Sequence, residues 1–277
     1  MSNKKDSLGD RMKANYENRA KTYLVRRMPV IVRLDGKAFH SFTRKLKKPY
    51  DEIFHNAMNT TLMYLCKNIQ GCKFGYTQSD EISLLLTDYD TLTTDAWFDN
   101  NVQKMCSIAA SMATLAFNKA FAHFADEYSN AVCAMQDTDI EKPYLEALHK
   151  CVEKGAMFDA RVFNIPEDEV VNAFIWRQND ATRNAIRMLG YCHYSSKAIE
   201  NVSNNELQDM LMLEKGVNFN DMPTEFKRGV CCIKKEVSCT DRLIGYKLDW
   251  VIDKEIPVFT QDRDYVGNTF RAKEVDL

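Results

Sequence analysis

The sequence lacks the features that mark several common classes of protein. No apolar run approaches the roughly 20 residues that a membrane span needs, and the polar start leads into no signal-peptide core. The nine cysteines include no CxxC pair, and the five histidines include no HExxH or other metal spacing, so we expect no structural zinc site. An odd number of cysteines fits reduced thiols, and we expect a cytoplasmic protein without membrane contacts.

Signatures of common nucleotide and hydrolase sites are also missing. The chain has no P-loop, no GxGxxG and no nucleophile elbow. Its net charge is −2, so any nucleic acid must bind a local basic surface rather than a basic protein as a whole. The length of 277 residues and the 45% hydrophobic content are typical of one large globular domain or two modest ones.

The apolar pattern predicts an α+β fold. Strands are expected at Pro29–Leu34, at Met157–Ile165 and as a short pair within Phe74–Leu86. Two later strands are expected at Gly229–Val237 and Leu243–Val251. Helices are expected at Asp6–Leu24, Lys48–Ile69, Asp95–Phe124, Pro166–Leu189 and Asn204–Glu214.

This order of elements favours a mixed or antiparallel sheet with helices on one face. We expect a main catalytic body at residues 1–190. Residues 191–277 are expected to form a C-terminal extension that packs on it, with a boundary near Tyr191.

Carboxylates stand where two predicted strands end or begin. Asp35 follows a buried strand, and Gly36 lets the backbone approach a ligand, so its carbonyl is a further candidate oxygen ligand. Asp80 and Glu81 adjoin at the predicted turn, where two repelling carboxylates gain most from a cation. A turn Asp-Gly and a solvated acidic turn are the structural alternatives. Together the three carboxylates favour Mg²⁺ and phosphoryl or nucleotidyl transfer.

Basic residues that could contact phosphates gather in several places, although a solvated face is the usual explanation for such residues. One set follows Asp35, and Arg161 alternates out of a predicted strand. Arg177 and Asp180 could simply pair on one helix. The candidates are Lys37, His40, Arg44, Lys45, Lys47, Lys48, Arg161, Arg177, Arg183, Lys227 and Arg228.

These segments resemble the tRNA(His) guanylyltransferase family, whose members add nucleotides to RNA 5′ ends in the 3′–5′ direction. The matching segments lie between Met28 and Ile186, and Lys215–Asp221 and Lys227–Gly229 match more loosely. The matching motifs are Val32–His40, Lys48-Pro49, Tyr76–Glu81, Phe158–Val162 and Trp176-Arg177-Gln178.

One segment departs from the eukaryotic members. Where those enzymes carry His-Ile-Asn-Asn-Leu-Tyr-Asn, this chain reads Ala181 to Arg187, and only Asn184 keeps its identity. This form resembles the bacterial, archaeal and phage guanylyltransferase-like proteins. The resemblance therefore implies template-dependent repair of 5′-truncated tRNA rather than non-templated guanylyl transfer to histidine tRNA.

The resemblance also implies a palm-like fold, a homotetramer built as a dimer of dimers, tRNA as partner, and ATP or GTP as substrates. Asp35, Gly36 and Asp80 would bind two Mg²⁺ ions, and the catalytic set would be Asp35, Asp80 and Glu81, with Glu81 in support. The implied nucleotide-binding residues are Lys37, Ala38, Phe39, His40, Lys48, Ser79 and Asn184. The implied RNA or phosphate contacts are Lys104, Arg161, Arg183, Lys227 and Arg228.

Three alternatives stay open at this point. The first is guanylyl transfer restricted to histidine tRNA. The second is a nucleotide- or RNA-binding protein with an inactive palm, which the intact carboxylates disfavour. The third is a palm-type nucleotidyl cyclase.

Overall fold

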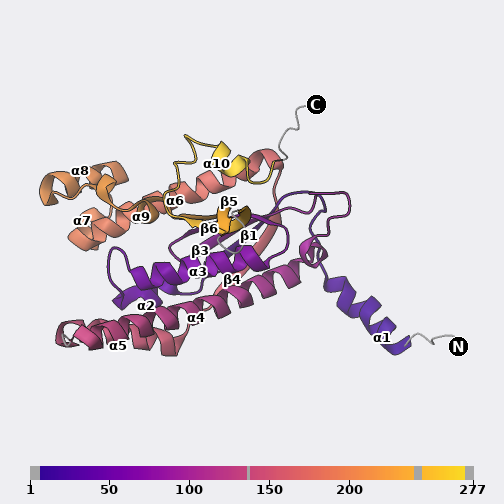
Figure 1. The fold of residues 1–277 in the computed structure, drawn as a ribbon, viewed down its shortest axis with the longest axis horizontal. Helices are drawn as coiled ribbons and strands as arrows, with labels where there is room; N and C mark the ends of the chain where they lie inside the picture. Colours follow the sequence, from indigo (N-terminus) through magenta and orange to yellow (C-terminus); the bar gives the residue numbers. More distant parts are fainter. Residues whose placement is uncertain (1–6, 136–137, 240–244, 272–277) are drawn as a thin grey trace.

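A computed structural model describes residues 7–135, 138–239 and 245–271 of the chain. One six-stranded sheet lies at its centre, with the strand order β4-β1-β3-β2-β5-β6 and every neighbouring pair antiparallel (Figure 1). The strands are β1 (Val30–Gly36), β2 (Cys72–Gln78), β3 (Glu81–Leu86), β4 (Phe158–Asn164), β5 (Val230–Cys239) and β6 (Gly245–Asp253). The predicted strands are therefore confirmed within a few residues, although the first two residues of the last one, 243 and 244, lie outside the described residues.

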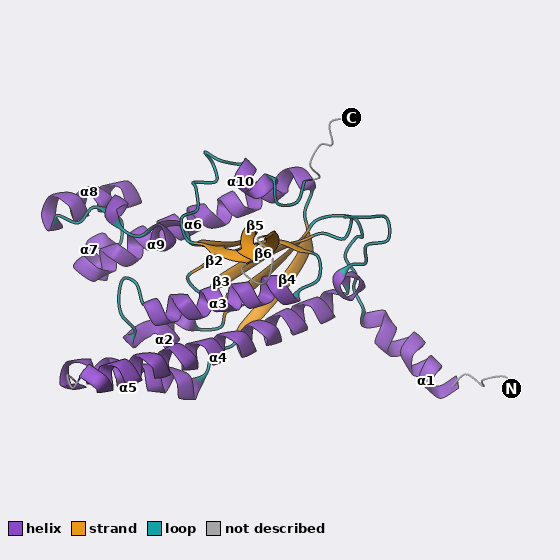
Figure 2. Cartoon of the chain, in the orientation of Figure 1, coloured by secondary structure: helices purple, strands orange, loops and turns teal. Residues whose placement is uncertain are grey.

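Two long helices cover one face of the sheet. They are α3 (Glu52–Asn68) and α4 (Val102–Met135), which pack on each other and on the sheet (Figure 2). Leu34, Ile82 and Leu84 point into this layer and are fully buried. The short α2 (Phe39–Phe42) adds its phenylalanines to the same core, and α5 (Thr138–Lys154) runs back along α4.

The second face of the sheet is covered as well, which corrects the expectation of helices on one face only. Helix α6 (Glu167–His193) packs Val170 and Phe174 against Ile31 and Phe74. The segment around Phe259 and α10 (Asp264–Gly267) completes this layer. The central strands carry apolar side chains at consecutive positions, so both of their faces must be shielded from water. The α+β class itself is confirmed.

The C-terminal part both extends the sheet and forms a separate helical cluster. Strand β5 pairs with β2, so the sheet itself continues into residues 230–253. Helices α7 (Ser196–Ile199), α8 (Asn204–Lys215) and α9 (Thr224–Arg228) pack on the end of α6. The expected boundary at Tyr191 falls in the last turn of α6, and the division into two domains stays a prediction.

The remaining helical predictions met mixed outcomes. The helices expected at Lys48–Ile69, Pro166–Leu189 and Asn204–Glu214 are confirmed. At the N-terminus only α1 (Ser7–Met12) is α-helical, followed by a π-helical and a 3₁₀ turn. The helix expected from Asp95 begins only at Val102, and α5 was not predicted at all. Among the described residues, no helix is long and apolar enough to cross a membrane.

Candidate active site

The predicted carboxylates meet at one end of the central strands. Strands β2 and β3 form a hairpin in which Gln78 faces Glu81, so Ser79 and Asp80 make the two-residue turn. Ser79 adopts a left-handed φ of 50°, which a hairpin turn of this length requires. The N–H of Gly36 donates to the Asp80 carbonyl oxygen at 3.0 Å, which joins the end of β1 to this turn. The structure therefore brings Asp35 and Asp80 to the same end of the sheet, as expected from the sequence, and their shared role stays a prediction.

Asp80 lies in a poorly solvated position. Burial raises the pKa of Asp80, and the charges of Asp35 and Glu81 raise it further. Hydrogen bonds from its own N–H and from the Ser79 hydroxyl, at 3.1 Å, oppose this shift in the pKa. Two neighbouring carboxylates and low solvation together favour a bound cation.

Asp35 is more open to solvent. Its side chain is 39% exposed, and its Oδ2 lies 3.6 Å from Nη2 of Arg161, whose guanidinium also faces Asp159 at 3.4 Å. Exposed ion pairs of this kind contribute little free energy, so Arg161 can give way to another cation.

The oxygen atoms at this end of the sheet fit magnesium chemistry. The Asp35 and Asp80 carboxylates and the Gly36 carbonyl are hard ligands, which Mg²⁺ prefers. Within residues 7–135, 138–239 and 245–271, no three acidic, histidine or cysteine side chains gather as a metal-binding group. Magnesium commonly takes only one or two protein carboxylates and completes its coordination with water and substrate phosphates. The donor set matches that pattern.

Glu81 does not share the freedom of the other two carboxylates. Arg33 Nη2 lies 2.6 Å from its Oε2, and Arg177 Nε lies 2.7 Å from its Oε1. Glu81 and Arg177 are both buried. Separating Glu81 from these arginines would leave an uncompensated buried charge, so we expect the two ion pairs to stay intact. Arginines from β1 and α6 thus hold Glu81, and its expected role in support of the catalytic site stays a prediction.

A cavity of about 120 Å³ lies beside the hairpin turn. It brings together Lys48, Ser79 and Asn184, three of the residues expected to bind nucleotide, from the α3 entry loop, the hairpin and α6. Apolar side chains from the segment around the start of α3, from α6 and from α9 also line it: Leu46, Pro49, Phe54, Ala181, Ala185, Met188 and Phe226. A mixed cavity of this kind suits a base or sugar on its apolar wall and phosphates on its polar wall.

Comparison with known proteins decides the family. The tRNAHis guanylyltransferase (Thg1) family model matches residues 9–166. The chain belongs to the tRNAHis guanylyltransferase family. It is similar to a bacterial Thg1-like protein solved in complex with ATP, with a TM-score of 0.76 and 41% identity over 96% of this chain and 100% of that one. A second structure, with the same description but in complex with GTP, gives a TM-score of 0.74 and 40% identity, covering 95% and 99% of the two chains.

A curated relative agrees with this assignment. The tRNA(His) guanylyltransferase of Saccharomyces cerevisiae is 28% identical, covering 74% of this chain and 82% of that protein. The resemblance seen in the motifs is therefore confirmed, and this family member is a nucleotidyltransferase.

Several expected nucleotide contacts lie outside the cavity of this family member. Lys37, Ala38 and His40 are exposed at the start of α2, and none of them lines the cavity. Phe39 is buried among Phe42, Phe54, Phe117 and Phe158, so its side chain is part of the core. A Cβ on Gly36 would lie 2.3 Å from the Phe39 ring. The close packing of this ring next to Asp35 therefore favours glycine at position 36. The Phe39 ring belongs to the aromatic core, and its expected role in nucleotide binding stays a prediction.

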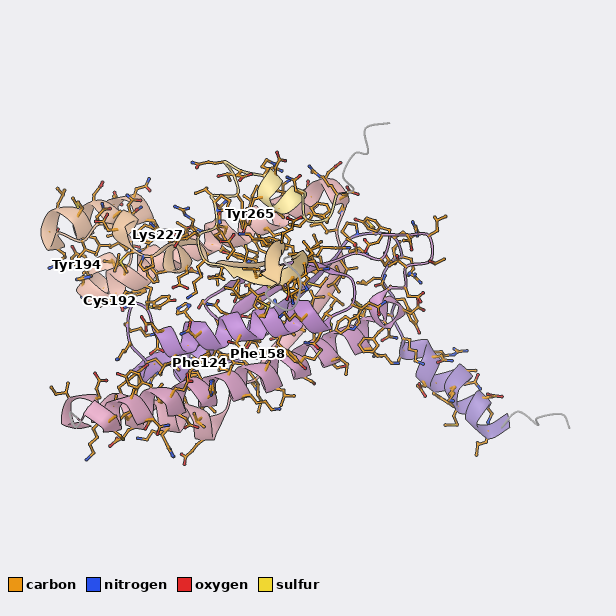
Figure 3. The ribbon with its side chains drawn as sticks, in the orientation of Figure 1. Phe124, Phe158, Cys192, Tyr194, Lys227 and Tyr265 are labelled. Carbon is orange, nitrogen blue, oxygen red and sulfur yellow. The ribbon has the colours of Figure 1, made fainter. Side chains whose placement is uncertain are left out.

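Three of the expected phosphate contacts are held by the protein itself. Arg183 pairs with Asp180, the Lys227 ammonium donates to the Asn220 carbonyl at 2.5 Å, and Arg228 donates to the Ile256 carbonyl at 3.2 Å. Lys227 lies on α9 beside the C-terminal helices (Figure 3). Lys104 lies in the first turn of α4. Along the helix it is thirteen residues, or about 20 Å, from Phe117, the residue of α4 that packs on Phe39. The structure therefore does not bring Lys104 to the cavity.

The cavity also contains residues that the sequence did not single out. His55 stacks on Tyr50 with ring centroids 4.0 Å apart, and burial lowers the pKa of His55 to about 3, helped by the charges of Lys254 and Lys48. Glu225 on α9 forms an ion pair with Lys254 at 3.1 Å. His55 lies one turn into the helix that follows Lys48-Pro49, and this position could have marked it as a cavity residue. Glu225 carried no such signal, because it is distant in sequence from the other cavity residues.

Proposed function

We propose that this protein adds nucleotides in the 3′–5′ direction to tRNA 5′ ends, chiefly as template-dependent repair of 5′-truncated tRNAs. The observation that carries the proposal is the meeting of Asp35 and Asp80 beside a cavity with Lys48, Ser79 and Asn184. Metal-binding oxygens next to a half-polar cavity are what transfer of a nucleotide requires.

In this proposal, Asp35, Asp80 and the Gly36 carbonyl would hold two magnesium ions. When bound, the ions lower the pKa of the attacking hydroxyl and stabilise charge on the polyphosphate. Lys48 would bind phosphate, and the Ser79 hydroxyl and Asn184 amide would orient ATP or GTP in the cavity. Arg33 and Arg177 keep Glu81 fixed beside Asp80.

The chemistry then takes two steps at one centre. A 5′-monophosphate end attacks the α-phosphate of ATP or GTP, and pyrophosphate leaves, which gives a 5′-5′ linked end. The 3′-hydroxyl of the incoming nucleotide attacks the activated RNA phosphate, and the nucleoside monophosphate leaves. A 5′-triphosphate end skips the first step, because pyrophosphate is already a good leaving group.

The preference for repair rests on the segment Ala181 to Arg187. In α6 this segment places Ala181, Asn184 and Ala185 on the cavity wall. The two small alanines leave room beside Asn184. Histidine-tRNA guanylyl transfer is the second candidate, because the curated relative from yeast carries that name.

A panel of tRNAs lacking one or more 5′ nucleotides tests the proposal, with each labelled triphosphate supplied separately. Repair predicts that the base complementary to the opposite strand is restored in every tRNA. Addition of guanosine alone, and only to histidine tRNA, would favour the second candidate. No incorporation would favour a binding protein with an inactive palm, and a cyclic product from ATP or GTP alone would favour a cyclase.

We also propose a homotetramer in the cytoplasm. Apolar side chains stand exposed on α4 and after α5, among them Ile108, Leu115 and Met157, which supports self-association. The described cysteines are free thiols, which fits a reducing compartment. Light scattering at several concentrations tests the tetramer, and a constant monomer mass would contradict it.

A further inference from the structure

Trp176 is a large aromatic side chain that stands half in solvent beside the active site. It is 51% exposed, whereas Trp97 is buried. Trp176 lies on α6, eight residues before Asn184 of the nucleotide cavity. An exposed indole in such a place is a candidate for binding.

Two arginines hold the inner side of the Trp176 ring. The guanidinium carbons of Arg177 and Arg33 lie 4.3 and 5.4 Å from the ring centroid. Both guanidiniums also bind the one carboxylate of Glu81, on the sheet. They therefore approach the ring from the sheet side, and the exposed part of the indole is the side turned away from the sheet. The ring is thus anchored by cation–π contacts and keeps a free surface.

The neighbouring edge strand adds an aromatic and a basic side chain. In β4, Arg161 is the cross-strand partner of Arg33, and Phe163 is the partner of Ile31, so both face the α6 side. Phe163 is 39% exposed and lines the same small groove as Trp176. β4 is the last strand of the sheet, so within the described residues no further strand pairs with its outer edge. Trp176, Phe163 and Arg161 together are called the Trp176 surface below.

The size and charge of the Trp176 surface restrict what can bind there. The groove between Trp176 and Phe163 encloses only about 10 Å³, which is too small for a base to enter. A flat group must therefore stack on the outside of the indole. Arg161, the cross-strand partner of Arg33, has 56% of its side chain exposed and lies near the two carboxylates of Asp159 and Asp35. Aromatic rings interleaved with arginine are the usual platform for unpaired bases and their phosphates.

We propose that Trp176 stacks an unpaired base of the RNA substrate while Arg161 contacts the adjoining phosphate. The proposal rests on the proposed function, because it places the RNA end next to Asp35, the cross-strand neighbour of Asp159. The partner is a single-stranded RNA end rather than a second copy of the chain, because the surface offers a cation beside the aromatics and lies at the carboxylate site.

Binding of a 5′-truncated tRNA with unpaired acceptor nucleotides tests this by titration, using the full chain and three variants. Trp176→Ala should weaken RNA binding about tenfold, as loss of one stacked base does. Trp176→Phe keeps a ring and should bind within about threefold of the native chain. Tyr191→Ala is the matched control, because Tyr191 is 53% exposed on the same helix, fifteen residues away. It should leave RNA affinity unchanged.

Tryptophan fluorescence gives a second readout that a merely structural role would not move. Stacking should quench the emission of the native chain on addition of the tRNA, and Trp176→Phe should lose that quenching while still binding RNA. ATP affinity and melting temperature, measured on every variant, report whether the cavity and the fold are intact.

The outcomes separate this inference from the proposed function. If the native chain binds no tRNA, the proposed function fails. If it binds tRNA, and Trp176→Ala binds equally well or the quenching persists in Trp176→Phe, only the stacking proposal is overturned. A change in oligomeric state of Trp176→Ala, seen by light scattering, would show instead that this surface contacts a second copy.

Discussion

Asp35 and Asp80 have different surroundings, although both end up at one site. Asp80 lies in the hairpin turn, where its carbonyl oxygen accepts a hydrogen bond from Gly36. Asp35 is partly exposed to solvent beside Arg161. The partly buried carboxylate would fix a cation, whereas the open one would let substrate and water reach it. This division of roles follows from the register, because Asp35 faces Glu81 across β1 and β3 while Asp80 lies in the turn beyond.

Replacing either carboxylate should remove activity without removing the fold. Loss of partners behind a metal ligand already costs roughly 10–100-fold in activity or metal affinity. We therefore expect Asp35→Ala and Asp80→Ala each to lower nucleotide addition more than about 100-fold. Asp159→Asn is the matched control, because Asp159 faces Asp35 on β4 but is not expected to bind metal. Full activity in either alanine variant would contradict the proposed metal site. Circular dichroism of each variant checks that the fold is intact.

His55 should make the protein acid-sensitive. Its pKa is lowered to about 3 in the folded chain, mainly by burial, against about 6.5 in the unfolded chain. Between these values the unfolded chain binds the proton that the folded chain excludes, so stability falls as the pH falls. From pH 7 to pH 5 this group should cost about 2 kcal/mol of unfolding free energy.

Urea unfolding at several pH values checks this expectation. His55→Gln should flatten the profile between pH 7 and pH 5. His149→Gln should not, because His149 is exposed on α5. Equal slopes for the native chain and His55→Gln would show that His55 is protonated in the folded state.

At the scale of elements, the start of α3 couples helix formation to the nucleotide cavity. The buried carboxylate of Asp51 accepts hydrogen bonds from the backbone N–H of Phe54 and of Lys47 and from the Tyr144 hydroxyl on α5. One side chain thus caps α3, holds the loop that presents Lys48, and fastens α5 to both. Lys47 reinforces the joint by lying over the rings of Tyr128 and Tyr144.

Asp51→Ala should therefore weaken both stability and nucleotide binding. Loss of an N-cap costs about 1 kcal/mol, and the other two acceptor roles should bring the total to about 2–3 kcal/mol. The affinity for ATP or GTP should fall several-fold, because the loop carrying Lys48 loses its anchor. Tyr144→Phe removes one of the three bonds and should show a smaller loss of stability. Unchanged ATP affinity in Asp51→Ala, measured by calorimetry, would contradict the coupling.

The elements that sequence predicted well are those with a strong local signal. The β1 run from Val30 to Leu34 is almost entirely buried, and the helix expected from Lys48 begins close by, at Glu52 after its cap Asp51. Helix α5 escaped notice because its sequence is polar and contains Pro143. The start of α4 was misplaced because the chain first makes a 3₁₀ turn with left-handed residues Phe98 and Asp99.

At the scale of the whole molecule, the features that could not be predicted are those formed by contacts between segments distant in sequence. The pairing of Glu81 with Arg33 and Arg177 joins three elements, and no local pattern distinguishes it from a solvated acidic turn. The cavity wall formed by Glu225 and Phe226 depends on α9 folding back onto α6. Asp35, Asp80, Lys48 and Asn184 were expected together because their motifs resemble those of a family, and the structure places them at or beside the cavity, whereas it does not bring Lys104 there.

The net charge of −2 sharpens what RNA binding must look like. The whole molecule does not attract a polyanion, so affinity must come from a few basic side chains that displace counterions. With about three phosphate contacts, the affinity for tRNA should fall roughly 40-fold between about 50 and 200 mM salt. Filter binding over this range measures the slope. Arg161→Gln should make it shallower by about one unit, since that residue is expected to contact a phosphate. A flat dependence in the native chain would argue against RNA as the partner, and an unchanged slope in Arg161→Gln would place the phosphate contacts elsewhere.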